Sequence, residues 1–497
     1  MSLVFRDAFW QISGRVVSAL AGFLVVKLIT PYLGPLRYGD YSTIFKYFAI
    51  WSALADFWIY VLALNSIWKV DDKWEKVKLY HKFLWFRFFM VMFVYVTAFL
   101  IAFFIPAYTN NSFIAYGLVV WMLFSATFML AGIVQLPLQI YWQMKQVSIA
   151  LILARIVQIS LLAIIIFVLF PNIDFSRINS QSILAFLLIL FSVLASWLVQ
   201  FFYVYTKWKK FMPFKLDFDK DFIKEKLKTN WRYGLSYYLS SFHTLIVLIF
   251  LSILFPTEQG FKYVWIWALS LALIEILLIV PSAFWNSIIH KISSYSKEKK
   301  QNSLWYFLLF IIWFGFLMLF NFILFKTQIV KLIAWNAYIT NNLHIGSDFI
   351  LPFLAIVLFF SFIKQVFNYI LVSFEKQNKL FEINLFWVSI WFLLALFLIP
   401  KYNIYGWIIT QIVLELLFVL WVVFIAKKYN ILPKLDLKLT FYVIFSWICA
   451  IITGYFLLKY IWSYLNTTIW FLLIAGFLNI LYLWASYKFI KFTMKKI

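Results

Sequence analysis

The chain has 497 residues, and its composition is far from that of a water-soluble protein. Hydrophobic residues make up 65% and charged residues 12%, and the mean hydropathy is +0.92. Soluble domains carry about 25% charged residues, and a water-exposed fold of this length could not bury so many apolar side chains. The composition excludes a soluble globular protein and predicts a chain whose main solvent is lipid.

The net charge of +24 would also suit a nucleic-acid-binding protein, but its distribution does not. The Lys and Arg residues lie in short connectors between apolar runs, as in membrane proteins that are oriented by charge and contact anionic headgroups. We therefore expect no nucleic-acid partner.

A single cysteine, Cys449, excludes an intramolecular disulfide. Phosphate-loop, dinucleotide and nucleophile-elbow motifs are missing, and the four histidines have no metal spacing, so we predict no cofactor, no metal and no enzyme.

Apolar runs begin close to the N-terminus, where no small-residue cleavage site follows the first one, so we expect a retained span and not a signal peptide. Fourteen runs have the length of about 20 residues that a membrane-spanning helix needs, whereas barrel strands would be about half as long. The sequence predicts an all-α polytopic membrane protein with about fourteen transmembrane helices. The runs are Ala8–Ile29, Tyr41–Ser66, Phe83–Ile105, Phe113–Val134, Val147–Phe170, Ile183–Tyr205, Tyr233–Phe255, Tyr263–Trp285, Leu304–Phe325, Ile350–Ser373, Leu380–Ile399, Ile404–Ala426, Phe441–Leu458 and Ile469–Tyr487.

Every second connector is rich in lysine and arginine, and the connectors between them are poor in both. The two termini and the rich connectors hold 30 of the 43 Lys and Arg residues, and the poor connectors hold seven. Because cytoplasmic loops carry the excess of positive charge, we predict a multi-pass protein of the inner (cytoplasmic) membrane with both termini in the cytoplasm. The alternation persists to the last run, which favours an even number of spans.

A basic segment divides the chain between the sixth and seventh runs. Apolar residues such as Phe222 and Leu227 are spaced among its lysines, so we expect it to lie partly on the inner leaflet as an amphipathic stretch. The two halves open alike, with Trp10 and Trp231 each ahead of a glycine. We predict two six-helix lobes, residues 1–206 and 233–426, a cytoplasmic basic linker at 207–232, and two further helices with a basic tail at 427–497.

Basic residues also occur inside the apolar runs, where each mid-helix charge costs roughly 2.5–3.5 kcal/mol. Arg15, Arg87 and Arg155 lie within about 12 Å of the cytoplasmic end of their helices at 1.5 Å per residue; Lys364 lies at a similar depth, and Arg232 lies at the mouth of the seventh run. Since guanidinium pairs bidentately with phosphate, the set predicts a cationic vestibule for a phosphate or pyrophosphate head group. The alternative is that each side chain snorkels to the interface. Arg15 and Arg155 are the strongest candidates, and Arg87 is nearer the surface.

Three acidic residues, Asp56, Glu275 and Glu415, lie deeper in their runs. A carboxyl group near the bilayer midplane is salt-bridged, protonated or a cation site. One interpretation is structural pairing with Lys364 or Arg15. The other is coupling of transport to protons or sodium ions.

The sequence resembles the polysaccharide-biosynthesis flippases, a glycan-exporting branch of the multidrug/oligosaccharidyl-lipid/polysaccharide (MOP) superfamily. The similarity is carried by Phe9–Gly14, by the connector Leu33–Tyr41 and by Leu54–Phe57. The resemblance implies a MATE-like pair of six-helix lobes and alternating access. It also implies that a polyprenyl-(pyro)phosphate-linked oligosaccharide is loaded from the cytoplasm, with membrane lipids and glycan-assembly enzymes as further partners.

Two other functions stay open. A cation-coupled small-molecule or drug antiporter of the same superfamily would need a functional acid in the first lobe, such as Asp56. A membrane glycan polymerase or ligase would need a sizeable external loop with catalytic residues. The longest external loop, Lys326–Phe349, is small for that role.

The chain departs from these flippases by carrying tryptophan where glycine is expected, at Trp58, Trp68 and Trp265. It contains 25 Trp and only 13 Gly, although membrane helices usually favour Gly. One hypothesis is that some of these codons are reassigned and read as Gly in the source organism. The alternative is an unusually aromatic chain with interfacial belts.

Overall fold

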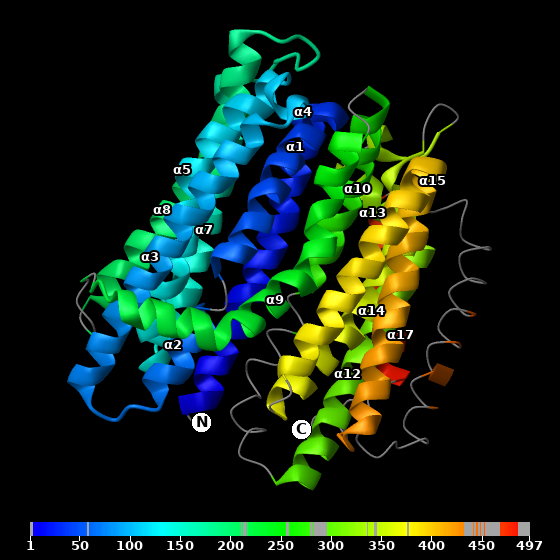
Figure 1. The fold of residues 1–497 in the computed structure, drawn as a ribbon. Helices are drawn as coiled ribbons and strands as arrows, with labels where there is room; N and C mark the ends of the chain where they lie inside the picture. The colour runs from blue at the N-terminus through cyan, green and yellow to red at the C-terminus, as the bar shows by residue number, and fades with distance from the viewer. Residues whose placement is uncertain are drawn as a thin grey trace. The chain divides into compact units, whose positions relative to one another are not determined.

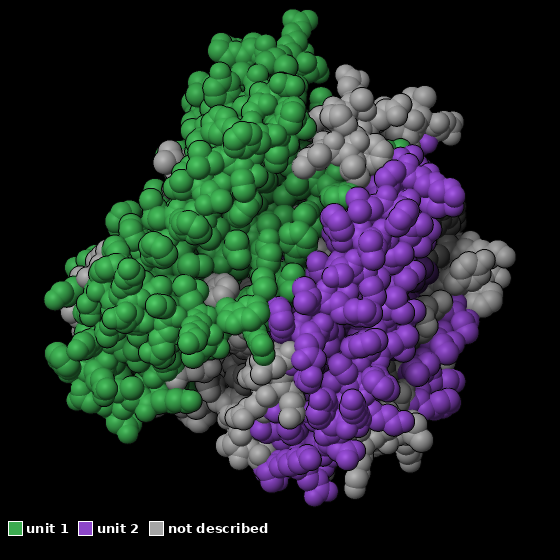
Figure 2. Space-filling view, in the orientation of Figure 1, with its two compact units in different colours: residues 1–268 green, residues 269–497 purple. Residues whose placement is uncertain are grey.

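A computed structural model describes residues 3–56, 59–209, 211, 215, 217–254, 258–278, 281, 296–334, 336–341, 345–374, 377–431, 441, 444, 445, 448, 452 and 468–485. No strand occurs among these residues, so the all-α prediction is confirmed for them. The chain forms two compact units, residues 1–268 and 269–497 (Figure 2). The predicted run Phe441–Leu458, most of its flanks, the basic tail and Trp58 lie outside the described residues, apart from five isolated positions in that run.

The first unit contains the helices from α1 to α9 and most of α10 (Figure 1). They are α1 (Leu3–Asp56), α2 (Ile59–Trp68), α3 (Lys73–Phe103), α4 (Pro106–Thr109), α5 (Ser112–Val134), α6 (Leu136–Ile140), α7 (Met144–Ile164) with the π-turn Ile165–Leu169, α8 (Ser180–Trp208), α9 (Lys220–Leu254) and α10 (Glu258–Leu277), whose last residues belong to the second unit. Within it α7 packs against α1 and α8, and α5 packs against α8.

The second unit contains five further labelled helices. They are α12 (Lys297–Leu324), α13 (Lys326–Ala334), α14 (Ser347–Ser373), α15 (Gln377–Lys428) and α17 (Thr468–Ala485), with a short 3₁₀ turn at Asn336–Tyr338. Here α14 packs against both α12 and α15. Eight helices of the described chain are long and apolar enough to cross a membrane.

Two of those eight helices are too long for one crossing. The apolar part of α1 runs over 44 residues, about 66 Å at 1.5 Å per residue, against a hydrocarbon core of about 30 Å. Gly34 breaks it with φ 67° and ψ 173°. No atom lies within 4 Å of a Cβ built there, so the backbone conformation and not crowding requires glycine. Asn403 (φ 50°) breaks α15 in the same way. Each helix therefore accounts for two predicted spans.

The basic linker packs on the first unit. Ile223 is buried in a hydrophobic cluster with Trp208, and Phe222 and Leu227 pack on the same cluster. The Lys82 ammonium lies 2.6 Å from the Asp219 carboxylate. This hydrogen bond, with one from the Phe222 N–H, holds the pKa of Asp219 below its usual range. Part of the apolar side of the linker thus contacts protein, while Phe218 and Trp231 are 63% and 43% exposed. Contact of the linker with the inner leaflet stays a prediction.

The boundary between the compact units falls after α9, later than the predicted boundary between lobes. The reason is that α9 packs extensively against α1, so the seventh predicted span belongs to the first unit. In the second unit, α17 is joined to α12 by paired amides: Asn321 and Asn479 exchange hydrogen bonds of 2.8 and 2.9 Å. The Tyr482 hydroxyl adds a bond of 3.2 Å to the Trp313 carbonyl.

Candidate functional site

Arg87 and Asp56 form a buried ion pair inside the first unit. The Arg87 guanidinium contacts the Asp56 carboxylate and donates to the Asp56 carbonyl at 2.9 Å. Its Nε donates to the Met129 carbonyl at 3.3 Å. The Arg87 side chain is 4% exposed and that of Asp56 25%. The pair buries the Arg87 guanidinium in the protein and neutralises most of its charge. Its depth in the membrane, nearer the surface than Arg15 and Arg155, stays a prediction.

Arg15 lies on α1 beside the polar residues of the next helices. The Tyr60 hydroxyl on α2 donates to the Gln139 side chain on α6 and lies within electrostatic range of both Arg15 and Asp56. Arg15 itself is half-buried. Two residues of opposite charge and a hydroxyl therefore share one region of the first unit.

Arg155 on α7 is held by neutral partners. Its Nε donates to Ser18 Oγ at 3.1 Å and its NH1 donates to Gln158 Oε1 at 2.7 Å. Among the described residues it forms no ion pair, so its charge is not cancelled. Ser18 is three residues, about one helical turn, from Arg15 on α1, so Arg155 contacts α1 one turn away from Arg15.

A close helix contact fixes this geometry. A Cβ on Gly14 would lie 2.6 Å from the Cβ of Ser148, and the Ser148 hydroxyl donates to the Trp10 carbonyl at 2.6 Å. The Lys145 ammonium lies 5.3 Å from the centre of the Trp10 ring. Because only glycine lets α1 and α7 approach so closely, Gly14 of the Phe9–Gly14 motif fixes the α1–α7 contact directly before Arg15 in the chain.

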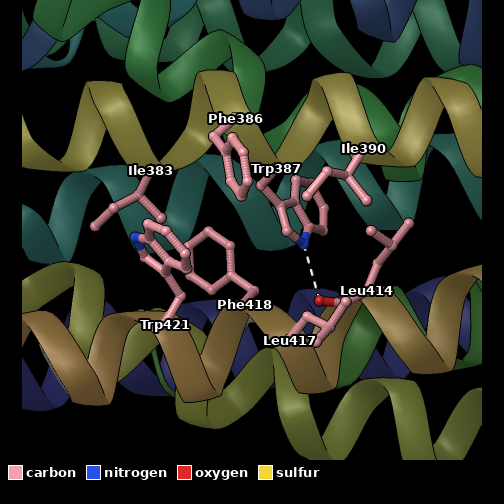
Figure 3. Close-up of a pocket in the computed structure, with 8 residues that line it drawn as sticks. All are labelled: Ile383, Phe386, Trp387, Ile390, Leu414, Leu417, Phe418 and Trp421. Atoms are coloured by element: carbon pink, nitrogen blue, oxygen red, sulfur yellow. Dashed lines mark hydrogen bonds between the residues drawn. The ribbon is translucent and has the colours of Figure 1, made fainter.

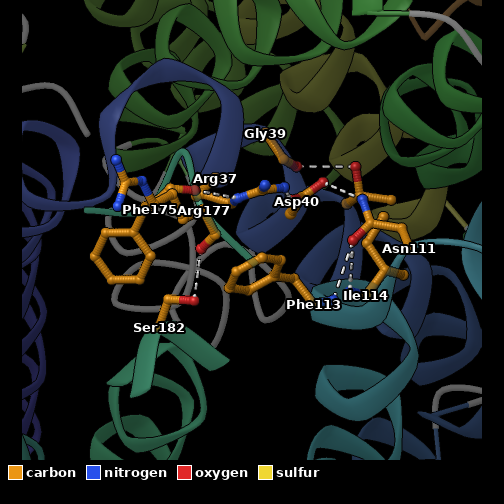
Figure 4. A network of polar contacts seen from close by, with 10 residues as sticks. Arg37, Gly39, Asp40, Asn111, Phe113, Ile114, Phe175, Arg177 and Ser182 are labelled. Atoms are coloured by element: carbon orange, nitrogen blue, oxygen red, sulfur yellow. Dashed lines mark hydrogen bonds and ion pairs between the residues drawn. The ribbon is translucent and has the colours of Figure 1, made fainter. Parts of the chain in front are cut away.

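The connector motif Leu33–Tyr41 forms a separate polar network (Figure 4). Arg37 pairs with Asp40 at 2.8 Å and donates to the Phe175 carbonyl at 3.1 Å. The Asn111 amide donates to Asp40 at 2.9 Å, while its oxygen accepts from the N–H of Phe113 and caps α5. Arg37 also stacks 4.1 Å from the Phe113 ring. With its ion pair satisfied, this motif is a structural tie between three segments, which the sequence did not reveal because the partners are far apart along the chain.

The second unit contains a buried charge pair. The Lys364 ammonium lies 2.6 Å from Glu415, whose side chain is 0% exposed. The ammonium also lies 4.7 Å and 5.3 Å from the ring centres of Trp387 and Phe418. The structural-pairing interpretation is therefore confirmed for Glu415 with Lys364. The aromatic cover of this pair was not predicted.

Two further predicted residues, Arg232 and Glu275, lie on α9 and α10. Arg232 is exposed, and its guanidinium lies 5.5 Å from the ring of Trp231. Glu275 is half-buried near the end of α10. Asp56 pairs with Arg87, where the sequence suggested Lys364 or Arg15. The candidate site in the first unit thus consists of Arg15, Arg155 and the Arg87–Asp56 pair.

Long apolar helices with arginines held in their interior are typical of a multi-pass membrane protein, and comparisons with known proteins give its family. The profile described as polysaccharide biosynthesis protein matches residues 4–280. The chain belongs to this family. A search of curated proteins found no match.

Solved structures share the fold. The inward closed conformation of the lipid II flippase MurJ superimposes with a TM-score of 0.70 at 14% identity, over 99% of this chain and 100% of that one. The multidrug transporter DinF-BH in complex with R6G gives 0.64 at 13% identity, over 86% and 95%. A MOP superfamily transporter from Pyrococcus furiosus gives 0.57 at 13% identity, also over 86% and 95%. The MATE-like and MurJ-like fold is thereby confirmed.

Proposed function

We propose that this protein is a flippase that moves a polyprenyl-(pyro)phosphate-linked oligosaccharide from the cytoplasmic to the outer leaflet by alternating access. The observation that supports this most is Arg155, a partly buried guanidinium whose hydrogen-bond partners are neutral and include Ser18, one helical turn from Arg15. An arginine without a carboxylate partner inside a membrane protein is costly unless an anion visits it. A phosphate or pyrophosphate group could accept two parallel hydrogen bonds from the guanidinium N–H groups of Arg155.

Family membership and fold support the same substrate class. The chain belongs to the polysaccharide biosynthesis proteins, and a solved neighbour is a flippase of lipid II. The Arg87–Asp56 pair has a structural role in this scheme, because its charges largely cancel. Lys364, Arg232, Glu275 and the cavity between two rocking lobes remain predictions, as do the cytoplasmic termini and contacts with glycan-assembly enzymes.

Translocation of a fluorescent undecaprenyl-pyrophosphate sugar in reconstituted vesicles tests this function. Changing Arg15→Gln and Arg155→Gln together should lower the rate about tenfold or more, since a hydrogen bond to a charged group contributes about 1.5–3 kcal/mol. Arg155→Lys should lose part of the rate, because it keeps charge but not the bidentate geometry. Arg177→Gln, on a side chain 84% exposed, is the matched control. Normal flipping by the double variant, with its melting temperature unchanged, would refute the head-group role.

A cation-coupled antiporter remains the second candidate because Asp56 keeps a quarter of its side chain exposed. Transport measured with the proton or sodium gradient collapsed, in wild type and Asp56→Asn, separates the two functions. An antiporter would lose export in both conditions. A flippase that is independent of these gradients would keep it, provided that the variant is folded.

A further inference from the structure

The two halves of α15 enclose a groove that the proposed site does not use (Figure 3). It has a volume of about 170 Å³, and every lining side chain is apolar. The lining residues are Ile383, Phe386, Trp387, Ile390, Leu414, Leu417, Phe418 and Trp421. An apolar cavity of about 150 Å³ stays dry and accepts a hydrocarbon guest. The groove is thus suited to an apolar ligand.

The floor of the groove is rigid and buried. The Trp387 indole N–H donates to the Leu414 carbonyl at 2.9 Å (Figure 3), which ties the two halves of α15 together. Trp387 and Phe418 are in edge-to-face contact with ring centres 5.4 Å apart. Both rings lie over Lys364. The floor therefore separates the buried Lys364–Glu415 pair from whatever occupies the groove.

The rim of the groove is open. Phe386, Leu417 and Trp421 are 50%, 44% and 45% exposed, and the rings of Phe386 and Trp421 lie 5.0 Å apart on facing halves. Since each half of α15 is long and apolar enough to cross a membrane, we expect the exposed side chains of the rim to contact lipid. The natural guest is a hydrocarbon chain of the bilayer.

The groove lies in one half of the membrane. From Lys379, at the start of α15, to Ile390 is eleven residues, or about 17 Å, which is close to half of a hydrocarbon core of about 30 Å. The second half of α15 returns to the same end and finishes with Lys427 and Lys428, both exposed. Lys379 is already paired with Glu382 at 2.7 Å. Lys428 follows the lining residue Trp421 by seven residues, about two helical turns, so it lies on the groove's face of α15 at headgroup depth, and Lys427 is its neighbour; neither forms an ion pair among the described residues.

We propose that this groove binds one acyl chain of an anionic phospholipid, whose phosphate is held by Lys427 and Lys428. An anionic headgroup complements these lysines, and a narrow groove confined to one leaflet suits an unbranched chain that starts at that headgroup. The bound chain covers Trp387 and keeps water and headgroups away from the Lys364–Glu415 pair. This site is distinct from the arginine site of the first unit and does not depend on the proposed substrate.

Photolabelling of the full-length protein in phosphatidylethanolamine vesicles tests the site. The probe is phosphatidylglycerol with a diazirine on its acyl chain, and labelled residues are located by mass spectrometry. We expect label on the rim residues of the groove. Leu417→Trp, which fills the groove, should lower this labelling roughly tenfold. Leu420→Trp is the matched control, because Leu420 is 57% exposed on the same half of α15 but does not line the groove.

The headgroup is tested by changing Lys427→Gln and Lys428→Gln together. Labelling by phosphatidylglycerol should fall about tenfold or more, because each lysine near the surface contributes about 1 kcal/mol, while labelling by a phosphatidylcholine probe with the same chain should not change. If Leu417→Trp and Leu420→Trp lose labelling equally, the groove does not bind the acyl chain. If the phosphatidylglycerol and phosphatidylcholine probes label the protein equally, the two lysines do not hold the headgroup. Preferential labelling by a polyprenyl phosphate probe, or cross-links from the groove to residues 441–458, would replace the phospholipid by another occupant.

Discussion

Trp142 adopts a backbone conformation that suits glycine. Its φ is 56° between α6 and α7, and a bulky residue in this left-handed region costs roughly 1–2 kcal/mol. Its ring contacts Trp68 edge-to-face at 5.6 Å, and Trp68 is one of the positions where the sequence led us to expect glycine. Trp265, by contrast, is buried in α10 with ordinary helical backbone. The strain at Trp142 favours the codon-reassignment hypothesis there, although the sequence did not single it out.

Replacing Trp142 by glycine tests this idea. We expect Trp142→Gly to change the free energy of unfolding by less than about 1 kcal/mol, because relief of strain offsets the lost ring contact. Trp121→Gly should cost about 3 kcal/mol or more, since Trp121 is buried in a helix against Phe45. Melting temperatures of the purified variants check both. Peptide masses from the native organism decide the residue itself, and tryptophan mass at 142 would end the hypothesis.

The Arg87–Asp56 pair makes a second prediction at the residue scale. Arg87→Met alone leaves a carboxylate in the interior and should destabilise by roughly 3–5 kcal/mol, whereas Arg87→Met with Asp56→Leu should cost much less. The exposed pair Arg177–Asp174, at 3.7 Å, serves as control and should contribute about 0–1 kcal/mol. A full double-mutant cycle by thermal unfolding measures the coupling energy, and a value near zero for Arg87–Asp56 would contradict its structural role.

Helix contacts depend on single small residues that a pattern can identify only in part. The motif Phe9–Gly14 was visible in the sequence, but its partner Ser148 was not, because a contact across more than a hundred residues leaves no periodic signal. The same holds for the Arg37–Asp40 pair: Arg37 donates to Phe175 and Asp40 accepts from Asn111, and both partners belong to other segments. The pairing of Glu415 with Lys364 could be expected, since a buried charge in lipid requires compensation.

The α1–α7 contact predicts a strong effect of a very small change. Gly14→Ala places a methyl group against Ser148 and should destabilise by roughly 1–3 kcal/mol, since this backbone contact leaves no room for relaxation. Adding Ser148→Gly should restore part of the stability, because it removes the colliding Cβ. Gly476→Ala is the control, with no atom within 4 Å of the new Cβ. Unfolding temperature measures all three, and a stable Gly14→Ala variant would refute the close contact.

At the scale of the whole molecule, hydropathy and charge bias are the sequence features that predict most of the architecture. The apolar runs predicted the positions of the long helices, because the membrane requires every backbone group to be satisfied within a helix. They did not predict that α1 and α15 each continue through a kink, since a single residue such as Gly34 decides the break. Nor did they predict that α9 joins the first unit, because that depends on its packing against α1.

The orientation in the membrane follows from the same charge bias and can be tested directly. The connector before α8 has few positive charges and the segment that starts α9 has many, so the two should face opposite sides. In a Cys449→Ala background, single cysteines at Arg177 and Lys224, both exposed, report this with a membrane-impermeant maleimide. Arg177→Cys should react in intact cells, and Lys224→Cys only after permeabilisation. Phosphate head groups loaded from the cytoplasm would then meet Arg15 and Arg155 from the side that the basic linker marks, whereas the reverse labelling would invert the transport direction proposed above.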